Sequence, residues 1–452
     1  MTLRQRIGLS ALLSVSAACW FAAQARADEA APAKRTLAFA IGGGPAGGAA
    51  PSLQCIVDAG PALPIAALAF TPDGEWLAVG GYQEVLLWHL DGAKLAKRLG
   101  VGQLAGMVQA VVFVDGGKAL AVGDGLPYQS GAVKIFDVET GQPTTTLAES
   151  KNVVCRLALS PDGKSLAVGD ADAHVYVWDL ATGQLAKTID AHKGWVLGLA
   201  FSPDGKRLAT AGTDQTLQVW DVSNWERIIQ YNLAATAHAA TFSPDSKTVI
   251  AAVGGLDEEP SLRTGRIDAD VEQASRRAPK TQTMSTGTGA PLDIVWPVKG
   301  AYLFAACDDS TVRAYQNGAK FTAPLRGHAD WVYGVAATPD GTKVASGSAD
   351  GTVKLWSITG GKPLATLVQL TPRSDDWLII TPQGHFTCSS PEAIRWKTSG
   401  SSPSPQELTA RYHNPELVCK ALAESAIQPP AAQGKSKTAP RPADNSKQQK
   451  KQ

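Results

Sequence analysis

A self-similar unit recurs along this chain, and its period restricts the possible folds more than any other feature of the sequence. Each copy carries a Pro-Asp-Gly turn, or a weaker form of it, between two apolar runs, as in residues 69–81. Six of these turns place an aspartate at Asp73, Asp115, Asp162, Asp204, Asp245 and Asp340. The spacings are 42, 47, 42, 41 and 95 residues. The long last gap contains one more copy, residues 293–315, so the sequence predicts seven units.

Each unit continues with a third apolar run that ends in an aromatic residue, such as "VYVWDL", and then with a fourth short run. Short runs separated by turns predict an all-β protein. Four strands per period of 40–45 residues favour a propeller, because one four-stranded sheet must stack on its neighbours to bury both faces. We therefore expect a seven-bladed β-propeller over residues 52–370, in which either residues 52–57 or residues 362–368 complete the last blade. In the fifth unit we expect strands at 237–243, 248–253, 265–271 and 278–284.

Two units share a spacing of four polar residues. A histidine precedes the terminal tryptophan by 28 residues, a hydroxyl residue by ten and an aspartate by six. The two sets are His192, Thr210, Asp214 and Trp220, and His328, Ser346, Asp350 and Trp356. With their Trp-Asp dipeptides, the units resemble WD repeats. The resemblance implies that each set forms a structural tetrad, hydrogen-bonded across its blade. The third unit keeps Asp172 and Trp178 without the histidine, and the sixth keeps Asp309 but ends in Tyr315.

The N-terminal residues 1–27 have the features of a signal peptide. Arg4 and Arg6 precede an apolar run, and Ala25-Arg26-Ala27 forms a small-x-small cleavage site. We therefore expect cleavage after Ala27, a periplasmic or secreted protein, and no membrane span after cleavage. Residues 28–51 are rich in alanine and glycine and are predicted to be a linker.

Beyond the repeats, residues 371–425 are predicted to form an extension with a hairpin at 378–387 and a helix at 415–424, capped by Asn414. The extension resembles a segment that follows WD repeats in large proteins of planctomycete-like bacteria. The resemblance rests on Trp377, Thr381-Pro382-Gln383-Gly384, Ile394-Arg395-Trp396 and the stretch 411–418. Residues 426–452 lack apolar content and are predicted to be a disordered basic tail.

Five cysteines remain after removal of the signal peptide. Cys155 and Cys307 lie inside apolar strand runs, where we expect them to be buried. Cys55, Cys388 and Cys419 lie outside the repeats. In an oxidising compartment two of these three can pair, but their spacing does not indicate which two.

Charge and motifs narrow the possible functions. Residues 28–425 hold 33 basic and 40 acidic residues, a net charge of −7, which disfavours nucleic acid as a partner. No motif has metal-ligand spacing or cradles a phosphate before a helix, so we expect no catalytic residues, metal or cofactor. We favour a monomeric, non-catalytic scaffold for protein–protein interaction. The alternatives are a propeller hydrolase or lyase with a site lining the channel, and a propeller that binds carbohydrate or cell wall.

Two connections between second and third strands are longer than the others, at residues 124–131 and 254–265, and the resemblance places both on one face of the disc. We expect this face to bind the partner, because loops on rigid scaffolds commonly carry function. The candidate residues are Tyr128, Asp257, Glu258, Glu259, Trp195 and Trp331.

Overall fold

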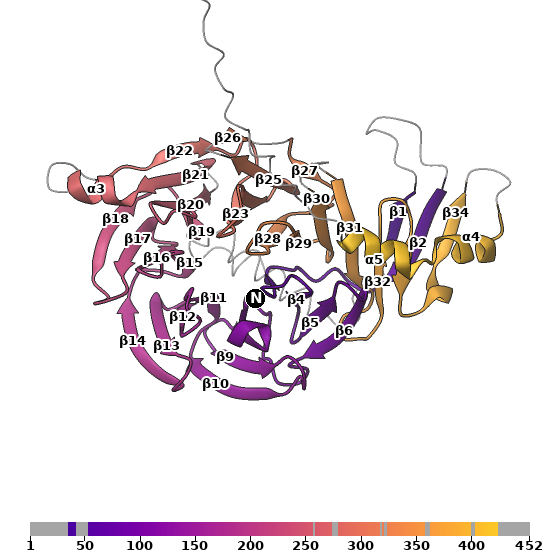
Figure 1. Cartoon of the computed structure of the whole chain (residues 1–452), viewed down its shortest axis with the longest axis horizontal. Helices are drawn as coiled ribbons and strands as arrows, with labels where there is room; N and C mark the ends of the chain where they lie inside the picture. The colour runs from indigo at the N-terminus through magenta and orange to yellow at the C-terminus, as the bar shows by residue number, and fades with distance from the viewer. Residues whose placement is uncertain are drawn as a thin grey trace, which may run out of the picture.

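The computed structural model shows a ring of seven antiparallel sheets and an eighth, three-stranded sheet beside it (Figure 1). It describes residues 35–41, 53–255, 258–273, 279–316, 319–320, 323–357, 362–398 and 403–423. The predicted fold class, an all-β seven-bladed propeller with a short C-terminal extension, is confirmed. The predicted signal peptide and the predicted basic tail lie outside the described residues.

The first four blades each consist of four consecutive strands, ordered from the channel outward. Blade 1 contains β3 (Leu68–Phe70), β4 (Trp76–Gly80), β5 (Val85–His89) and β6 (Lys94–Leu99). Blade 2 contains β7 (Ala110–Val114), β8 (Ala119–Leu126), β9 (Ser130–Asp137) and β10 (Pro143–Ser150), with the 3-10 turn η1 (Asp115–Gly117). Blade 3 contains β11 (Val154–Leu159), β12 (Ser165–Asp170), β13 (His174–Asp179) and β14 (Gln184–Asp190). Blade 4 contains β15 (Val196–Phe201), β16 (Arg207–Gly212), β17 (Thr216–Asp221) and β18 (Arg227–Asn232).

The last three blades follow the same order with additions. Blade 5 contains β19 (Ala237–Phe242), β20 (Thr248–Gly255), β21 (Glu258–Arg266), the helix α3 (Ile267–Gln273) and β22 (Gln282–Ser285). Blade 6 contains β23 (Pro291–Val295), β24 (Leu303–Cys307), β25 (Thr311–Gln316) and two short outer pieces, β26 (Ala319–Lys320) and β27 (Leu325–Arg326). Blade 7 contains β28 (Val332–Ala337), β29 (Val344–Ser348), β30 (Val353–Ser357) and β31 (Lys362–Gln369).

The inner strands close the ring without exchanging a strand between its ends. Each first strand contacts the first strand of the next blade, and β28 contacts β3. Of the two terminal segments considered from the sequence, residues 362–368 fall within β31 and complete blade 7. The other segment falls within β2 (Leu53–Ala59), which joins β1 (Arg35–Ala40) and β34 (Arg395–Thr398) in the eighth sheet.

The repeated turn folds through its own side chains. In blade 4 the Ser202 hydroxyl donates to Asp204 Oδ1 at 2.5 Å, and the same oxygen accepts the Lys206 amide at 3.1 Å. Gly205 follows the aspartate with a φ of +71°, a conformation that side chains with a Cβ rarely adopt. Blades 1, 3 and 7 repeat this arrangement, which explains why the Pro-Asp-Gly turn is the most visible marker in the sequence.

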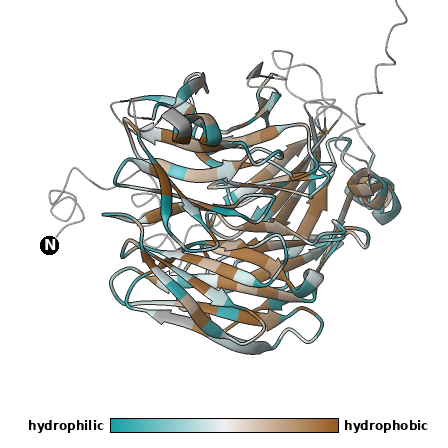
Figure 2. Cartoon of the chain, turned by 60° about the vertical axis from the view of Figure 1, so that its left-hand side comes forward, coloured by the Kyte–Doolittle hydropathy of each residue, from teal (hydrophilic) through white to brown (hydrophobic). Residues whose placement is uncertain are grey.

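The core consists of apolar layers between neighbouring blades. Figure 2 shows hydrophobic residues concentrated along the strands inside the disc. One such cluster joins blade 4 to blade 5, from Leu217 and Tyr231 to Phe242 and Val249. Ile267 of α3 joins this cluster, and the Tyr231 hydroxyl donates to Asp270 of the same helix at 2.9 Å. Burial against a neighbour is therefore what holds each sheet in the ring.

Three predictions about element boundaries were wrong. Residues 35–40 form a strand inside the predicted linker, because β1 pairs along the whole length of β2. Residues 53–59 belong to the eighth sheet and not to a blade. Residues 265–271 form the end of β21 and most of α3 in place of a third strand, and the third strand begins earlier, at Glu258.

The C-terminal extension packs against blade 7. The predicted hairpin corresponds to β32 (Trp377–Ile380) and β33 (Phe386–Cys388), which widen blade 7 to six strands. The turn η2 (Pro391–Ala393), β34 and the helix α4 (Pro405–Tyr412) follow. The predicted terminal helix is α5 (Pro415–Ala423), where Asn414 Oδ1 accepts the Leu417 amide at 3.0 Å. Val418 and Leu422 of α5 enter the core shared by blades 1 and 7.

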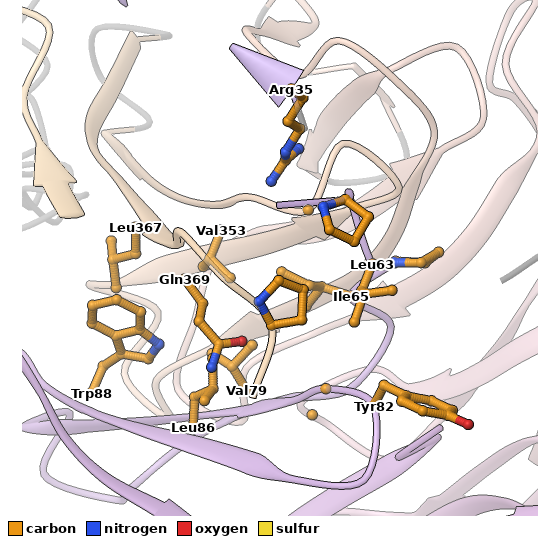
Figure 3. A pocket seen from close by; sticks show the side chains of 16 residues that line it. Arg35, Leu63, Ile65, Val79, Tyr82, Leu86, Trp88, Val353, Leu367 and Gln369 are labelled. Carbon is orange, nitrogen blue, oxygen red and sulfur yellow. The ribbon is translucent and has the colours of Figure 1, made fainter. Parts of the chain in front are cut away.

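Polar contacts fasten the seam between blades 7 and 1. The buried Glu84 carboxylate accepts from Arg98 Nε at 2.6 Å, from Gln369 Nε2 at 3.0 Å and from the Arg373 amide at 3.0 Å. Arg35 of β1 donates to the Gly60 carbonyl at 3.0 Å and to the Asp350 carbonyl. A cavity of about 40 Å³ lies at this seam. Figure 3 shows its lining, with Arg35 at one end and Trp88 at the side. That volume suits one or two water molecules and is far below the size of a small-molecule site.

Candidate functional site: the central channel and the upper face

The four polar residues predicted in blade 4 form one hydrogen-bonded chain. His192 Nδ1 lies 2.9 Å from Asp214 Oδ1, and His192 Nε2 lies 2.9 Å from Thr210 Oγ1. Trp220 Nε1 donates to the same Thr210 hydroxyl at 3.1 Å. Burial raises the pKa of Asp214, but the hydrogen bond and charge of His192 outweigh it and lower this pKa to about 2. These groups therefore hold one another and are not directed toward a ligand.

Blade 7 repeats the chain with Ser346 in place of the threonine. His328 Nδ1 lies 3.0 Å from Asp350 Oδ2, His328 Nε2 lies 2.8 Å from Ser346 Oγ, and Trp356 Nε1 donates to Ser346 Oγ at 2.7 Å. Burial lowers the pKa of His328, although Asp350 opposes this effect. The pKa of Asp350 is lowered by His328 and Thr352, which together outweigh its burial.

The blades without the histidine use other partners. In blade 3, Asn152 Nδ2 donates to Asp172 at 2.8 Å, so an amide takes the place of the imidazole. In blade 6, Arg313 pairs with Asp309 and donates to the Gly289 carbonyl at 3.1 Å. These substitutes do not reach the aromatic residue. Within the described part of the chain, the side-chain polar atoms of Trp88, Trp178 and Tyr315 are buried without a hydrogen-bond partner.

An ion pair crosses the central channel. Arg156 lies on the inner strand of blade 3 and Asp293 on that of blade 6, and Arg156 Nη2 lies 3.0 Å from Asp293 Oδ1. Arg156 Nε donates to the Leu197 carbonyl of blade 4 at 2.9 Å. Asp293 Oδ2 accepts the Val335 amide of blade 7 at 3.0 Å. One pair of side chains thus links four blades.

Sequence reasoning missed this pair, although a signal exists. Five inner strands carry a β-bulge at the same place, and the residue after it is Arg156, Gly198, Ala239, Asp293 or Gly334. An added Cβ at Gly198 would meet the backbone of Ala240 in β19 at 2.6 Å, and one at Gly334 would meet the backbone of Ala66, just before β3, at 2.3 Å. The position therefore favours very small residues. Aligning the units on the bulge would have shown two large residues of opposite charge where the others are small.

A histidine lies near this pair. His238 is buried on β19, and its Nε2 lies 3.1 Å from the Gly254 carbonyl. Burial lowers the pKa of His238 to about 4, and the charge of Arg156 contributes to this shift. The imidazole is therefore neutral at pH 7 and donates to the carbonyl through Nε2.

The predicted partner face is the one on which each inner strand begins, here named the upper face. Because the strands of a blade alternate in direction, the connections between second and third strands and between successive blades lie there. The bridge between Tyr82 and Met107 joins one connection of each kind. The two long loops expected on this face are hairpins. β8 and β9 pair as far as Leu126 with Ser130, and β20 and β21 pair as far as Gly255 with Glu258.

The candidate partner-binding residues take separate places on the upper face. Tyr128 is 71% exposed at the tip of the β8–β9 hairpin, where the Asn152 side chain accepts its amide at 3.1 Å. Glu259 is exposed near the start of β21, and Glu258 is the first residue of that strand. Asp257 lies outside the described residues. The acidic hairpin is in blade 5 and Tyr128 in blade 2, so the structure does not unite them in one cluster.

Trp195 and Trp331 are partly buried at the start of their inner strands. Trp195 packs on an apolar cluster near the channel that includes Met107 and Leu197. The Trp331 ring lies edge-on to the Tyr333 ring, with 6.3 Å between their centroids. Both tryptophans therefore have packing roles and also present part of their surface on the upper face.

Two further features bear on ligands. An open groove of about 650 Å³ lies on the outer edge of the ring, between β6, the turn Thr140–Gln142 of blade 2 and Trp377. Of its basic residues, Lys97 donates to the Val138 carbonyl at 2.8 Å and Arg98 is held by Glu84. The described residues contain no group of three acidic, histidine or cysteine residues placed to hold a metal ion.

In the described part of the chain, no helix is long and apolar enough to span a membrane.

Four segments match the WD domain, G-beta repeat family: residues 55–89, 141–179, 183–221 and 319–357. The chain is also similar to the small ribosomal subunit protein RACK1 of Brassica napus, at 37% identity over 73 residues, which are 16% of this chain and 22% of that protein. It is 42% identical over 60 residues to RACK1y of Oryza sativa subsp. japonica, or 13% and 18% of the two chains. The matches thus span less than a quarter of these relatives.

Among solved structures, a chain in the crystal structure of the mitotic checkpoint complex is similar, with a TM-score of 0.54 and 20% identity. The similarity covers 64% of this chain and 88% of that one, and it shows a shared fold. The ring and its closed inner circle define a β-propeller. The last two matched segments contain the hydrogen-bonded sets of blades 4 and 7, so the chain is a β-propeller in which four segments are similar to WD repeats.

Proposed function

We propose that this protein is a non-catalytic scaffold that binds a protein partner through its upper face and acts outside the cytoplasm. WD-repeat propellers typically bind protein partners. The similar proteins are named for a ribosomal subunit and a checkpoint complex, which are both assemblies of many components. The observation that carries the proposal is Tyr128, a large aromatic side chain exposed on a hairpin that Asn152 fixes to the ring. Binding energy concentrates in such anchors.

The polar groups of the central channel also support a non-catalytic role. Its ion pair, Arg156 with Asp293, is used to join four blades, and His238 is neutral and hydrogen-bonded to a carbonyl. Each group has a structural role, whereas acid–base catalysis needs a group within hydrogen-bond reach of a substrate. The exposed tip of the β8–β9 hairpin on the upper face is thus favoured over the channel as the place where a partner binds.

Tyr128→Asn tests the upper face. Tyr128 has a φ of +57°, which asparagine tolerates, so the hairpin should keep its shape. Partner capture from the envelope and extracellular fractions is expected to weaken roughly tenfold. The matched control is Val298→Asn, because Val298 is 52% exposed in the turn between β23 and β24, on the opposite face. Equal capture by the Tyr128 variant and the wild type would contradict the proposal, as would an equal loss in the Val298 control.

Export is tested separately. Intact-mass measurement of the protein purified from its own cells is expected to show a chain that begins at Asp28. A soluble cytoplasmic protein that retains residues 1–27 would contradict the extracellular part of the proposal and leave the interaction part standing.

A further inference from the structure

The three cysteines outside the repeats contact two different cores. Cys55 of β2 is fully buried in the core of the eighth sheet, and Cys388 of β33 packs against this same core. Cys419 of α5 packs against the core shared by blades 1 and 7. All five cysteines of the described residues carry free thiols. The structure thus brings two of the three together, which their spacing in the sequence did not indicate.

Cys55 and Cys388 face the same core from two different sheets. Cys55 is paired with Trp396 of β34, and directly opposed residues of antiparallel strands project to the same side. The Trp396 ring lies 6.2 Å from the Phe386 ring of β33. Cys388 is two residues after Phe386 and projects to the same side of its strand. Both thiols therefore lie beside the contact between the Phe386 and Trp396 side chains. Cys55 is on the strand that precedes the propeller in the chain, and Cys388 is on the hairpin that follows its last blade strand.

We propose that Cys55 and Cys388 form a disulfide bond that joins β2 to β33 and so links the two ends of the propeller covalently. The blades exchange no strand at the seam, where side-chain contacts such as those of Glu84 hold blade 1 to blade 7. A bond between residues 55 and 388 encloses the whole ring in one covalent loop. Cross-links that enclose long loops restrict the unfolded chain most, so the bond would stabilise the closed ring.

The oxidant is a small-molecule or protein disulfide, for which glutathione disulfide serves as the probe. One cysteine thiolate attacks a glutathione sulfur, the glutathione S–S bond breaks, and one glutathione thiolate leaves. The second cysteine thiolate attacks the mixed disulfide and releases the other glutathione. Two protons and two electrons thus pass from the two cysteines to one glutathione disulfide.

The bond should form more readily during folding than in the folded protein. Burial raises the pKa of Cys55 to about 12, with a contribution from the neighbouring Cys388. Burial also raises the pKa of Cys388, to about 11. Because the thiolate is the reactive form, the folded protein reacts slowly and the unfolded chain reacts faster.

The test uses the purified mature chain, refolded from urea in mixtures of reduced and oxidised glutathione. Remaining thiols are alkylated under denaturing conditions and mapped by mass spectrometry. We expect loss of two alkylated sites and one cross-linked peptide pair containing Cys55 and Cys388, with Cys155, Cys307 and Cys419 alkylated. Cys55→Ser and Cys388→Ser should each abolish the cross-link, whereas the matched control Cys307→Ser should retain it.

A cross-link to Cys419, or glutathione adducts with no internal cross-link, would overturn the proposal. The oxidised chain is also expected to melt several degrees above the reduced chain, and this difference should vanish in Cys388→Ser. Equal melting temperatures of the oxidised and reduced chains would show that the bond does not stabilise the closed ring. The occurrence of the bond in the cell rests on the proposed export, but its formation in the refolded chain does not, so the two ideas fail separately.

Discussion

Arg156 and Asp293 are 137 residues apart in the chain, yet their side chains meet 3.0 Å apart across the central channel. Their inner strands belong to blades 3 and 6, which face each other across the ring. Asp293 is the more deeply buried, with 11% of its side chain exposed against 23% for Arg156. Burial raises the pKa of Asp293, and the charge of Arg156 opposes this shift. Each charged side chain is thus the main group that offsets the cost of burying the other.

Removal of one partner should destabilise the ring more than removal of both. We expect Asp293→Ala to lower the free energy of unfolding by about 2–4 kcal/mol, because it leaves a partly buried guanidinium without its carboxylate. In the double variant Arg156→Ala/Asp293→Ala, the two positions carry the small residue found at Ala239 after the same bulge. The double variant should recover much of the loss. Urea titrations analysed as a double-mutant cycle measure the coupling, and strictly additive losses would contradict it.

Two buried tryptophans form a matched pair for testing the hydrogen-bonded set of blade 7. Trp356 and Trp88 are both buried at the end of a third strand, but only Trp356 donates through Nε1, to Ser346. Both Trp→Phe changes remove a similar volume. Trp356→Phe should therefore destabilise the protein by about 1 kcal/mol more than Trp88→Phe. Equal unfolding free energies for the two variants would show that the Ser346 hydrogen bond contributes nothing.

The neutral His238 predicts a pH dependence. Its pKa is about 4 in the folded protein, and a histidine in the unfolded chain titrates near 6.5. Between these values the unfolded chain binds more protons, so the free energy of unfolding falls as the pH falls from 6.5 toward 4. At pH 5 this single group accounts for a loss of about 2 kcal/mol relative to pH 7.

His238→Gln keeps a donor for the Gly254 carbonyl and removes the titration. The difference in unfolding free energy between pH 7 and pH 5, from urea titrations, should shrink by about 2 kcal/mol in this variant. A variant with the same pH dependence as the wild type would sink the assignment of His238 as the group responsible.

The repeated parts of this fold were predictable because each unit repeats the same local chemistry. The spacing of His192, Thr210, Asp214 and Trp220 is a property of one blade, so one stretch of sequence contains it all. The Arg156–Asp293 pair is different, because it depends on which inner strands face each other after closure of the ring. No single unit indicates such a contact, which becomes visible only when the units are compared at the shared bulge.

The eighth sheet was missed for a similar reason. Its strands β2 and β34 are separated by all seven blades, so no local pattern indicates that they pair with each other. In blade 5 the sequence predicts a strand at 265–271, where the structure has the end of β21 and most of α3. The acidic Asp268 and Asp270 in the first turn instead favour a helix N-terminus, and α3 begins there.

The seam provides the last prediction, because it is the one place where blades far apart in sequence must adhere without a shared strand. Glu84 precedes β5 of blade 1, and its carboxylate accepts from Gln369 at the end of β31 and from the amide of Arg373. Glu84→Ala removes both contacts and leaves Arg98 without the partner that lies 2.6 Å from its Nε. We expect the free energy of unfolding to fall by about 2–4 kcal/mol, and amide exchange to be faster in β31 and β6 than in the blades opposite.

The control is Asp268→Ala, which breaks an ion pair with Arg207. The Asp268 side chain is 59% exposed, so this change should lower the free energy of unfolding by less than about 1 kcal/mol. Unchanged exchange protection in β31 of the Glu84 variant would show that apolar packing, including Val418 and Leu422 of α5, is sufficient to hold the ring closed.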